Sequence, residues 1–137
     1  MPHIGPNVTL DEPAFIHETA QIQGKVYIGK GVSVWTYAVT RSEVHEIRIG
    51  ARTNIQDNTV IHVDAGVPVI IGTDVSVGHS AVIHACRIGD ECLIGMGCTI
   101  LDEAEIGERS IVGANALVTQ RTKIPPRSLV LGSPAKV

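Results

Sequence analysis

Aromatic side chains are scarce in this sequence of 137 residues, at 3% of the total, although hydrophobic residues make up 44% of it. The core must therefore be built from aliphatic side chains. Isoleucine and valine each occur 17 times, whereas leucine occurs only 6 times. Because β-branched side chains are stiff at χ1 and fit pleated surfaces, this composition predicts an all-β fold and argues against a helical bundle.

Cysteines, basic clusters and long apolar runs are scarce as well. Cys86, Cys92 and Cys98 form no CxxC pair, so we expect small core residues rather than disulfides or a thiolate metal site. No apolar run approaches the roughly 18 residues of a membrane helix, and the N-terminus lacks a signal-peptide pattern. The net charge of −3 provides no basic surface of the kind that binds nucleic acid. We therefore expect a soluble, cytoplasmic protein with no membrane or nucleic-acid partner.

Aliphatic residues recur at every sixth position along most of the chain, and glycine often follows them. The longest unbroken series is Ile88, Ile94, Ile100, Ile106, Val112, Val118 and Ile124. This period fits neither a helix nor an ordinary strand, but it fits a coil that turns a corner every six residues and points each aliphatic side chain inward. We predict a single repeat domain over residues 1–137, with roughly seven stacked triangular coils.

The period is interrupted at three places. Three extra residues lie within segment 34–49 and four within segment 61–71, whereas one residue is missing within segment 83–88. We expect the two insertions to form loops that project from corners of the coils.

Residues one coil apart stack in columns once these insertions are subtracted. His62 and His84 then lie one above the other, with backbones about 4.8 Å apart, and Arg41 precedes them in the same column. Two imidazoles at this separation can bind one ion through bonds of about 2.0 to 2.1 Å. The spacing therefore predicts a two-histidine ladder that can ligate a metal.

A second polar cluster is predicted on the neighbouring face, where His79 stacks on Asp57 beside Gln56. One chain thus holds the ladder and the cluster on different faces. In a three-fold trimer, the ladder of one chain would face the cluster of the next and create a site with three histidines and an open fourth position. A homotrimer of this kind would place metal sites formed by His62, His79 and His84 between its subunits.

The segments that carry these residues resemble the γ-class carbonic anhydrases, which are left-handed parallel β-helices built from hexapeptide repeats. The repeat extends the resemblance over essentially the whole chain, and the specific motifs are segments 41–43, 54–57, 61–62 and 78–84. The resemblance implies an all-β, left-handed parallel β-helix. Relatives continue into a C-terminal helix, which the sequence up to Val137 does not contain.

The resemblance also implies roles for individual residues. Gln56 would contact metal-bound solvent, and Arg41 and Asp57 would join neighbouring subunits near the bicarbonate site. An ion pair that only holds the trimer together is an equally open reading of Arg41 and Asp57. The metal implied by the resemblance is zinc, with iron or cobalt as alternatives, and its ligands would be His62, His79 and His84.

The implied reaction is the reversible hydration of CO2 to bicarbonate. A three-histidine metal with an open position lowers the pKa of bound water to about 7, so hydroxide is available to attack CO2. Gln56 would orient this hydroxide, and Arg41 would stabilise the bicarbonate charge.

Two departures from the family pattern affect the expected activity. Strongly active members carry a long acidic loop after the first metal histidine, whereas segment 63–68 is short and Asp64 is its only carboxylate. We therefore predict weak or conditional hydratase activity. Glu43 stands where the family usually carries aspartate, which lengthens this side chain by one carbon.

Two other functions remain open at this stage. Relatives with a short loop and the same three histidines are assigned acyl-CoA thioesterase activity, so an acyl-CoA thioesterase or acyltransferase is the first alternative. A narrow polar pocket would favour CO2, whereas an open apolar groove would favour a CoA ester. A non-catalytic trimeric scaffold is the second alternative.

Overall fold

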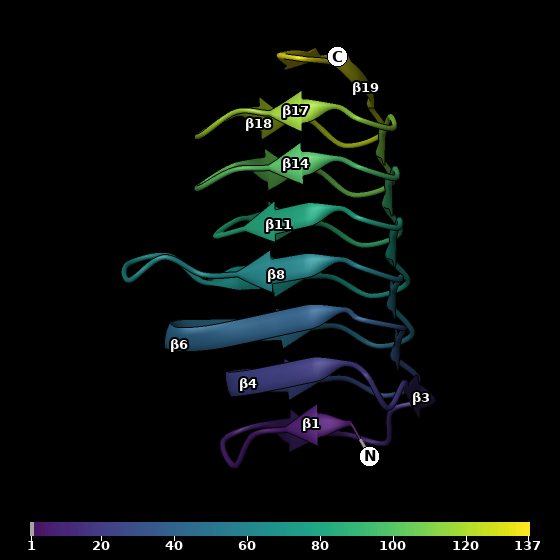
Figure 1. Ribbon diagram of the computed structural model, residues 1–137. Coiled ribbons are helices and arrows are strands. Elements are labelled where there is room, and N and C mark those ends of the chain that lie inside the picture. Colours follow the sequence, from purple (N-terminus) through teal and green to yellow (C-terminus); the bar gives the residue numbers. More distant parts are fainter. Residues whose placement is uncertain (1) are drawn as a thin grey trace.

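The computed structural model describes residues 2–137 and consists of triangular coils stacked along one axis (Figure 1). These residues contain strands and turns but no helix, and hence no helix that could span a membrane. Most strands are two or three residues long, and from β7 to β16 each pairs in parallel with the strand three places further along the chain. The strands therefore form three faces, which we number 1 to 3.

Two long strands pass from face 1 round a corner onto face 2, namely β4 (Gln21–Ile28) and β6 (Val39–Ile49). The other strands of face 1 are β1 (His3–Ile4), β8 (Val60–His62), β11 (Val82–His84), β14 (Thr99–Ile100) and β17 (Leu117–Val118). Those of face 2 are β2 (Thr9–Leu10), β9 (Val69–Ile71), β12 (Arg87–Ile88), β15 (Glu105–Ile106) and β18 (Lys123–Ile124).

Face 3 is a separate sheet. Its strands are β3 (Phe15–Ile16), β5 (Ser33–Val34), β7 (Asn54–Ile55), β10 (Ser76–Val77), β13 (Leu93–Ile94), β16 (Ile111–Val112) and β19 (Leu129–Gly132). At the C-terminal end, β20 (Ala135–Lys136) pairs antiparallel with β19. This architecture confirms the predicted all-β solenoid of about seven coils.

The six-residue period places one aliphatic column inside each face. On face 1 the paired inward residues are Ile4, Ile22, Thr40, Ile61, Ile83, Ile100 and Val118. Those above the first coil are buried, whereas Ile4 is 36% exposed. Thr40 replaces an aliphatic residue in this column, and its buried hydroxyl has no hydrogen-bond partner among the described residues.

The three cysteines are buried in the interior, which confirms their prediction as core residues. Cys98 is fully buried, and burial raises the pKa of Cys86 to about 12. A thiol in such surroundings stays protonated and behaves as a small apolar side chain.

The corners are marked by residues in the left-handed region of the backbone. Along the corner between faces 3 and 1, this conformation recurs in five successive coils, at Tyr37, Asn58, Ser80, Gly97 and Asn115. Few residue types prefer it, and asparagine and glycine are among those that do. The corner chemistry thus follows the same repeat as the core.

The prediction of a loop in the first insertion was wrong. Residues 43–46 lie within β6, which continues unbroken to Ile49. Gly24 pairs with Ser42 and Val26 with Ile47, so four residues of β6 lie opposite one residue of β4 as a wide bulge. Because β4 also rounds this corner, the extra residues stay next to a strand.

The second insertion does form the predicted projecting loop, between β8 and β9 (Figure 1). Asp64 and Val67 pair across it in an antiparallel bridge. The loop begins directly after His62 and therefore borders the predicted ladder.

Candidate metal centre

Arg41, His62 and His84 lie in one column on the outside of face 1, as predicted. Arg41 pairs with His62, and His62 pairs with His84, through β6, β8 and β11. Each follows an inward-pointing residue, and successive side chains of a strand point to opposite faces. The interior column of face 1 thus determines that these three side chains point outward.

The two histidine rings of the ladder face each other through one nitrogen each. Nδ1 of His62 lies 3.1 Å from Nε2 of His84, and the ring planes are inclined by 61°. Two nitrogens that bind one tetrahedral ion at about 2.0 to 2.1 Å lie about 3.3 Å apart. The donor chemistry and spacing of this pair therefore fit a shared metal ion, and both side chains are only partly exposed.

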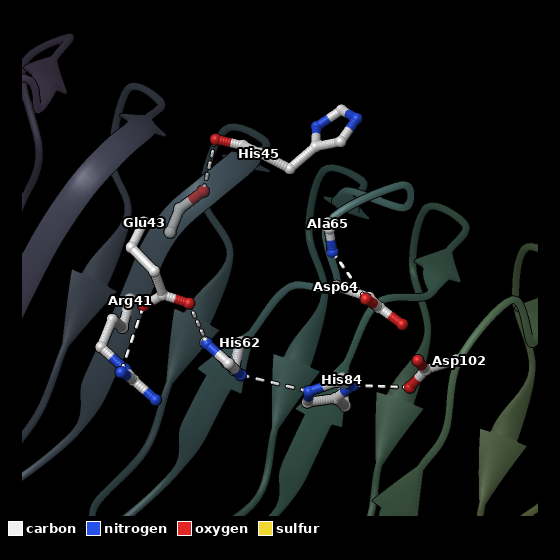
Figure 2. A network of polar contacts seen from close by, with 9 residues as sticks. Arg41, Glu43, His45, His62, Asp64, Ala65, His84 and Asp102 are labelled. Carbon is white, nitrogen blue, oxygen red and sulfur yellow. Dashed lines mark hydrogen bonds and ion pairs between the residues drawn. The ribbon is translucent and has the colours of Figure 1, made fainter.

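Carboxylates bind the two outer nitrogens of the ladder (Figure 2). Nε2 of His62 lies 2.5 Å from Oε1 of Glu43, whose other oxygen lies 3.2 Å from Nη1 of Arg41. Nδ1 of His84 lies 2.5 Å from Oδ1 of Asp102. A continuous chain of polar contacts therefore runs along face 1 from Arg41 to Asp102.

Both carboxylates of this chain of contacts favour the ionised form. The hydrogen bond with His62, followed by the charges of His62 and Arg41, lowers the pKa of Glu43. Burial alone would raise the pKa of Asp102, but hydrogen bonds with His84 and Asp64 and the charge of His84 outweigh burial and lower it. Each carboxylate can therefore accept a hydrogen bond from its histidine.

Sequence reasoning missed Asp102 as part of the ladder. The coil after Ile83 is one residue short, and Ile83 pairs with Ile100. The column position after His84 therefore falls on Leu101, and Asp102 lies one position beyond it. Its side chain nevertheless reaches His84. The only signal in the sequence was an acidic residue directly beside the predicted column position.

The predicted cluster on face 3 is also assembled. Nδ1 of His79 lies 3.4 Å from Oδ1 of Asp57. These two residues and Gln56 line a hollow of about 330 Å³ together with Trp35 and Asn54. The column of Asp57 and His79 is thus confirmed, with both side chains half-exposed.

The structure does not bring the ladder and the cluster together within one chain. The ladder lies at the ends of β8 and β11, whereas His79 follows β10 in the other sheet. Within residues 2–137 no group of three histidine, cysteine, aspartate or glutamate side chains is arranged to hold a metal ion. The ion-pair partner of Arg41 in the chain is Glu43 rather than Asp57.

Comparisons with known proteins reveal clear relatives. A family profile described as bacterial transferase hexapeptide (six repeats) matches residues 85–120. A probable carbonic anhydrase of Methanocaldococcus jannaschii is 57% identical over 122 residues, which cover 89% of this chain and 77% of the relative. A carbonic anhydrase of Geobacillus kaustophilus is 44% identical over 136 residues, which cover 99% of this chain and 75% of the relative.

A solved structure and two plant relatives complete the comparison. A hexapeptide transferase family protein from Anaplasma phagocytophilum superposes with a TM-score of 0.90 at 40% identity, covering 94% of this chain and 76% of that chain. Two mitochondrial γ carbonic anhydrases of Arabidopsis thaliana are 43% and 42% identical over 93% of this chain. The chain spans about half of their length, at 48% of each.

Proposed function

This chain belongs to the γ-class carbonic anhydrase-like family of hexapeptide-repeat proteins, and on this premise we propose that it forms a homotrimer that binds a divalent metal between subunits and hydrates CO2. His62 and His84 of one subunit would ligate the metal together with His79 of the next. The observation that carries the proposal is the 3.1 Å separation between Nδ1 of His62 and Nε2 of His84. The donors fit zinc, and imidazole also suits iron or cobalt.

Exposed apolar side chains support the trimer. On face 3, Leu93, Ile111 and Leu129 are about half exposed, and Val60 is 40% exposed on face 1. Contiguous apolar surface of this kind marks interaction sites in soluble proteins. Contact between face 1 of one subunit and face 3 of the next would cover these side chains and bring the ladder to the cluster.

A metal on three imidazoles with an open position supplies water that is activated for nucleophilic attack near neutral pH. The side-chain amide of Gln56 would orient this water by hydrogen bonding. The guanidinium of Arg41 would bind the carboxylate of bicarbonate, whose negative charge develops during attack. Asp57 would hold His79 through its Nδ1, which leaves Nε2 of His79 for the metal.

The net reaction converts CO2 and water into bicarbonate and a proton, so the proton must leave the site. Asp64 is the only carboxylate of the loop at 63–68, and its Oδ1 accepts a hydrogen bond from the backbone N–H of Ala65 at 2.6 Å. The loop offers no second carboxylate to pass the proton on to solvent. We therefore propose that hydratase activity is weak.

Thioester chemistry is the second candidate function. The matching family profile and the Anaplasma phagocytophilum relative are both described as transferases. The same activated water could attack the carbonyl carbon of an acyl-CoA thioester, releasing the carboxylic acid and free thiol. Both reactions would use the same metal ligands, His62, His79 and His84. Only the substrate would distinguish thioester hydrolysis from CO2 hydration.

Metal content and mass test the proposal together. The protein is purified without chelators, its metals are measured by elemental analysis and its mass by light scattering. About three metals per trimer are expected. A trimer that contains no metal and cannot be reloaded would contradict the proposal and favour a structural scaffold.

Activity assays on the metal-loaded trimer then separate the substrates. Stopped-flow measurement of CO2 hydration is run beside hydrolysis of short acyl-CoA esters, followed through the released thiol. We expect slow CO2 hydration. Thioester hydrolysis without CO2 hydration would favour the second candidate, and fast CO2 hydration would contradict the predicted weak activity.

A further inference from the structure

Each histidine of the ladder contacts the other through one ring nitrogen and a carboxylate through the other. Glu43 lies at the outer nitrogen of His62, and Asp102 lies at the outer nitrogen of His84, both at 2.5 Å. The inner nitrogens are separated by 3.1 Å. The order along face 1 is thus carboxylate, imidazole, imidazole, carboxylate (Figure 2).

From this arrangement we propose that Glu43 and Asp102 are positioning residues that select the tautomers of His62 and His84 and thereby aim Nδ1 of His62 and Nε2 of His84 at the metal. The inference rests on the proposed function, because it assumes that the ladder binds a metal. It adds two residues that would act through the histidines and would not ligate the ion themselves.

The chemistry of imidazole carries the argument. A neutral imidazole has one N–H and one lone pair, and an ionised carboxylate only accepts hydrogen bonds. The N–H groups therefore lie at Nε2 of His62 and Nδ1 of His84, toward the carboxylates. The two inner nitrogens then present lone pairs to each other across 3.1 Å. Facing lone pairs repel each other unless a cation lies between them. Both inner nitrogens are therefore oriented to ligate a metal ion.

Glu43 is held in place from two sides. Its Oε2 pairs with Arg41, and its backbone belongs to the bulge of residues 43–46 in β6. The hydroxyl of Ser42 donates a 2.6 Å hydrogen bond to the carbonyl of His45 and so closes this bulge. The insertion in β6 therefore brings a carboxylate over His62, which is the first metal histidine.

Asp102 is the less exposed partner, with 21% of its side chain accessible. It lies at the corner that follows β14 and beside Asp64 of the projecting loop. On face 3, Oδ1 of Asp57 lies 3.4 Å from Nδ1 of His79, a longer contact than those made by Glu43 and Asp102. Each of the three proposed metal histidines therefore has its own carboxylate.

The consequence is a defined contribution to metal affinity. Carboxylates that bind the second nitrogen of a metal-ligating histidine fix its orientation and raise its basicity, and their removal weakens metal binding about 10- to 100-fold. We expect this range for Asp102→Asn and for Glu43→Gln. Both substitutions keep the shape of the side chain and remove the charge.

The test measures zinc affinity of the assembled protein by competition with a chelating indicator. Asp102→Asn and Glu43→Gln are compared with two control substitutions, Glu105→Gln and Glu46→Gln. Glu105 pairs with Lys123 on face 2. Glu46 belongs to the same bulge as Glu43, and its Oε2 lies 3.8 Å from Nζ of Lys25 in β4. The controls should bind zinc as tightly as the unaltered protein. Light scattering and thermal unfolding establish that all four variants assemble and fold.

A second readout reports the tautomers without any metal. Long-range ¹⁵N–¹H correlation spectra of the metal-free protein distinguish an N–H at Nδ1 from one at Nε2. We expect His84 to carry its proton at Nδ1 and His62 at Nε2. In Asp102→Asn the proton of His84 should shift toward Nε2, and His79 should remain unchanged.

The outcomes separate this inference from the proposed function. If the unaltered trimer binds no zinc, the proposed function fails and the metal-facing role fails with it. If the unaltered trimer binds zinc but Asp102→Asn and Glu43→Gln bind it equally tightly, only the positioning role is overturned. Unchanged histidine tautomers in Asp102→Asn would overturn it as well.

Discussion

His62 and His84 are 22 residues apart in the sequence, yet Nδ1 of the first lies 3.1 Å from Nε2 of the second. This proximity results from the parallel register between β8 and β11, in which the two residues pair directly. The four extra residues of the loop after β8 leave that register intact because they project outward at a corner. A short coil repeat thus brings two histidine side chains together without any long-range folding of loops.

His84→Ala should abolish metal binding and leave the trimer intact. The substitution removes one of the two facing nitrogens, so face 1 would supply only His62 as a ligand. We expect the metal content to fall at least about tenfold, measured by elemental analysis.

His3→Ala is the matched control for this substitution. His3 lies in β1 on the same face, four coils below His84, and its side chain is exposed. Its loss should leave the metal content unchanged. Full metal content in His84→Ala would refute the assignment of His84 as a ligand.

The cysteines should be unreactive in the native protein. All three are buried, and burial raises the pKa of Cys86 to about 12. Because the thiolate is the reactive form, a group whose pKa lies this far above the assay pH of about 8 contains very little of it. Ellman's reagent should therefore detect almost no thiol before unfolding and three per chain in denaturant. Rapid reaction of the native protein would show that the interior opens.

The period of six was sufficient to predict the fold because one large aliphatic residue per repeat points inward, and interior columns such as Ile22 and Ile83 depend only on that period. The column of His62 and His84 followed from the same arithmetic. The bulge in β6 did not, because the number of inserted residues does not reveal whether the neighbouring strand also rounds the corner. Contacts of Glu43 and Asp102 with the histidines depend on side-chain reach beyond the column, which spacing does not describe.

Thr40→Val should stabilise the protein. The hydroxyl of Thr40 is buried in the interior column of face 1 without a hydrogen-bond partner among the described residues. Valine has nearly the same shape and removes the unsatisfied group, whose burial costs about 1 to 3 kcal/mol. We expect the free energy of unfolding of the metal-free protein to rise by about 1 kcal/mol in urea titrations at one protein concentration.

Thr53→Val provides the opposite case. The hydroxyl of Thr53 is also buried, but it donates to the carbonyl of Gly72 at 2.7 Å and accepts from the N–H of Val75 at 3.2 Å. Its removal leaves two backbone groups without this partner and should lower the free energy of unfolding by about 1 to 3 kcal/mol. If both substitutions changed the free energy of unfolding equally, the hydrogen bonds of the threonine hydroxyl would not determine whether its removal stabilises or destabilises the protein.

Gly24→Ala should disrupt the bulge that carries Glu43. Gly24 has a φ of +87°, and a Cβ there would lie 2.0 Å from the carbonyl oxygen of Ser42, so β4 and β6 would have to separate. We expect a loss of about 1 to 3 kcal/mol in the free energy of unfolding, together with weaker zinc binding because Glu43 moves away from His62.

Gly66→Ala is the control, since a Cβ at Gly66 meets no atom within 4 Å. It should change the free energy of unfolding by less than about 0.5 kcal/mol. A stable Gly24→Ala variant with normal zinc affinity would show that metal binding does not require the geometry of the bulge.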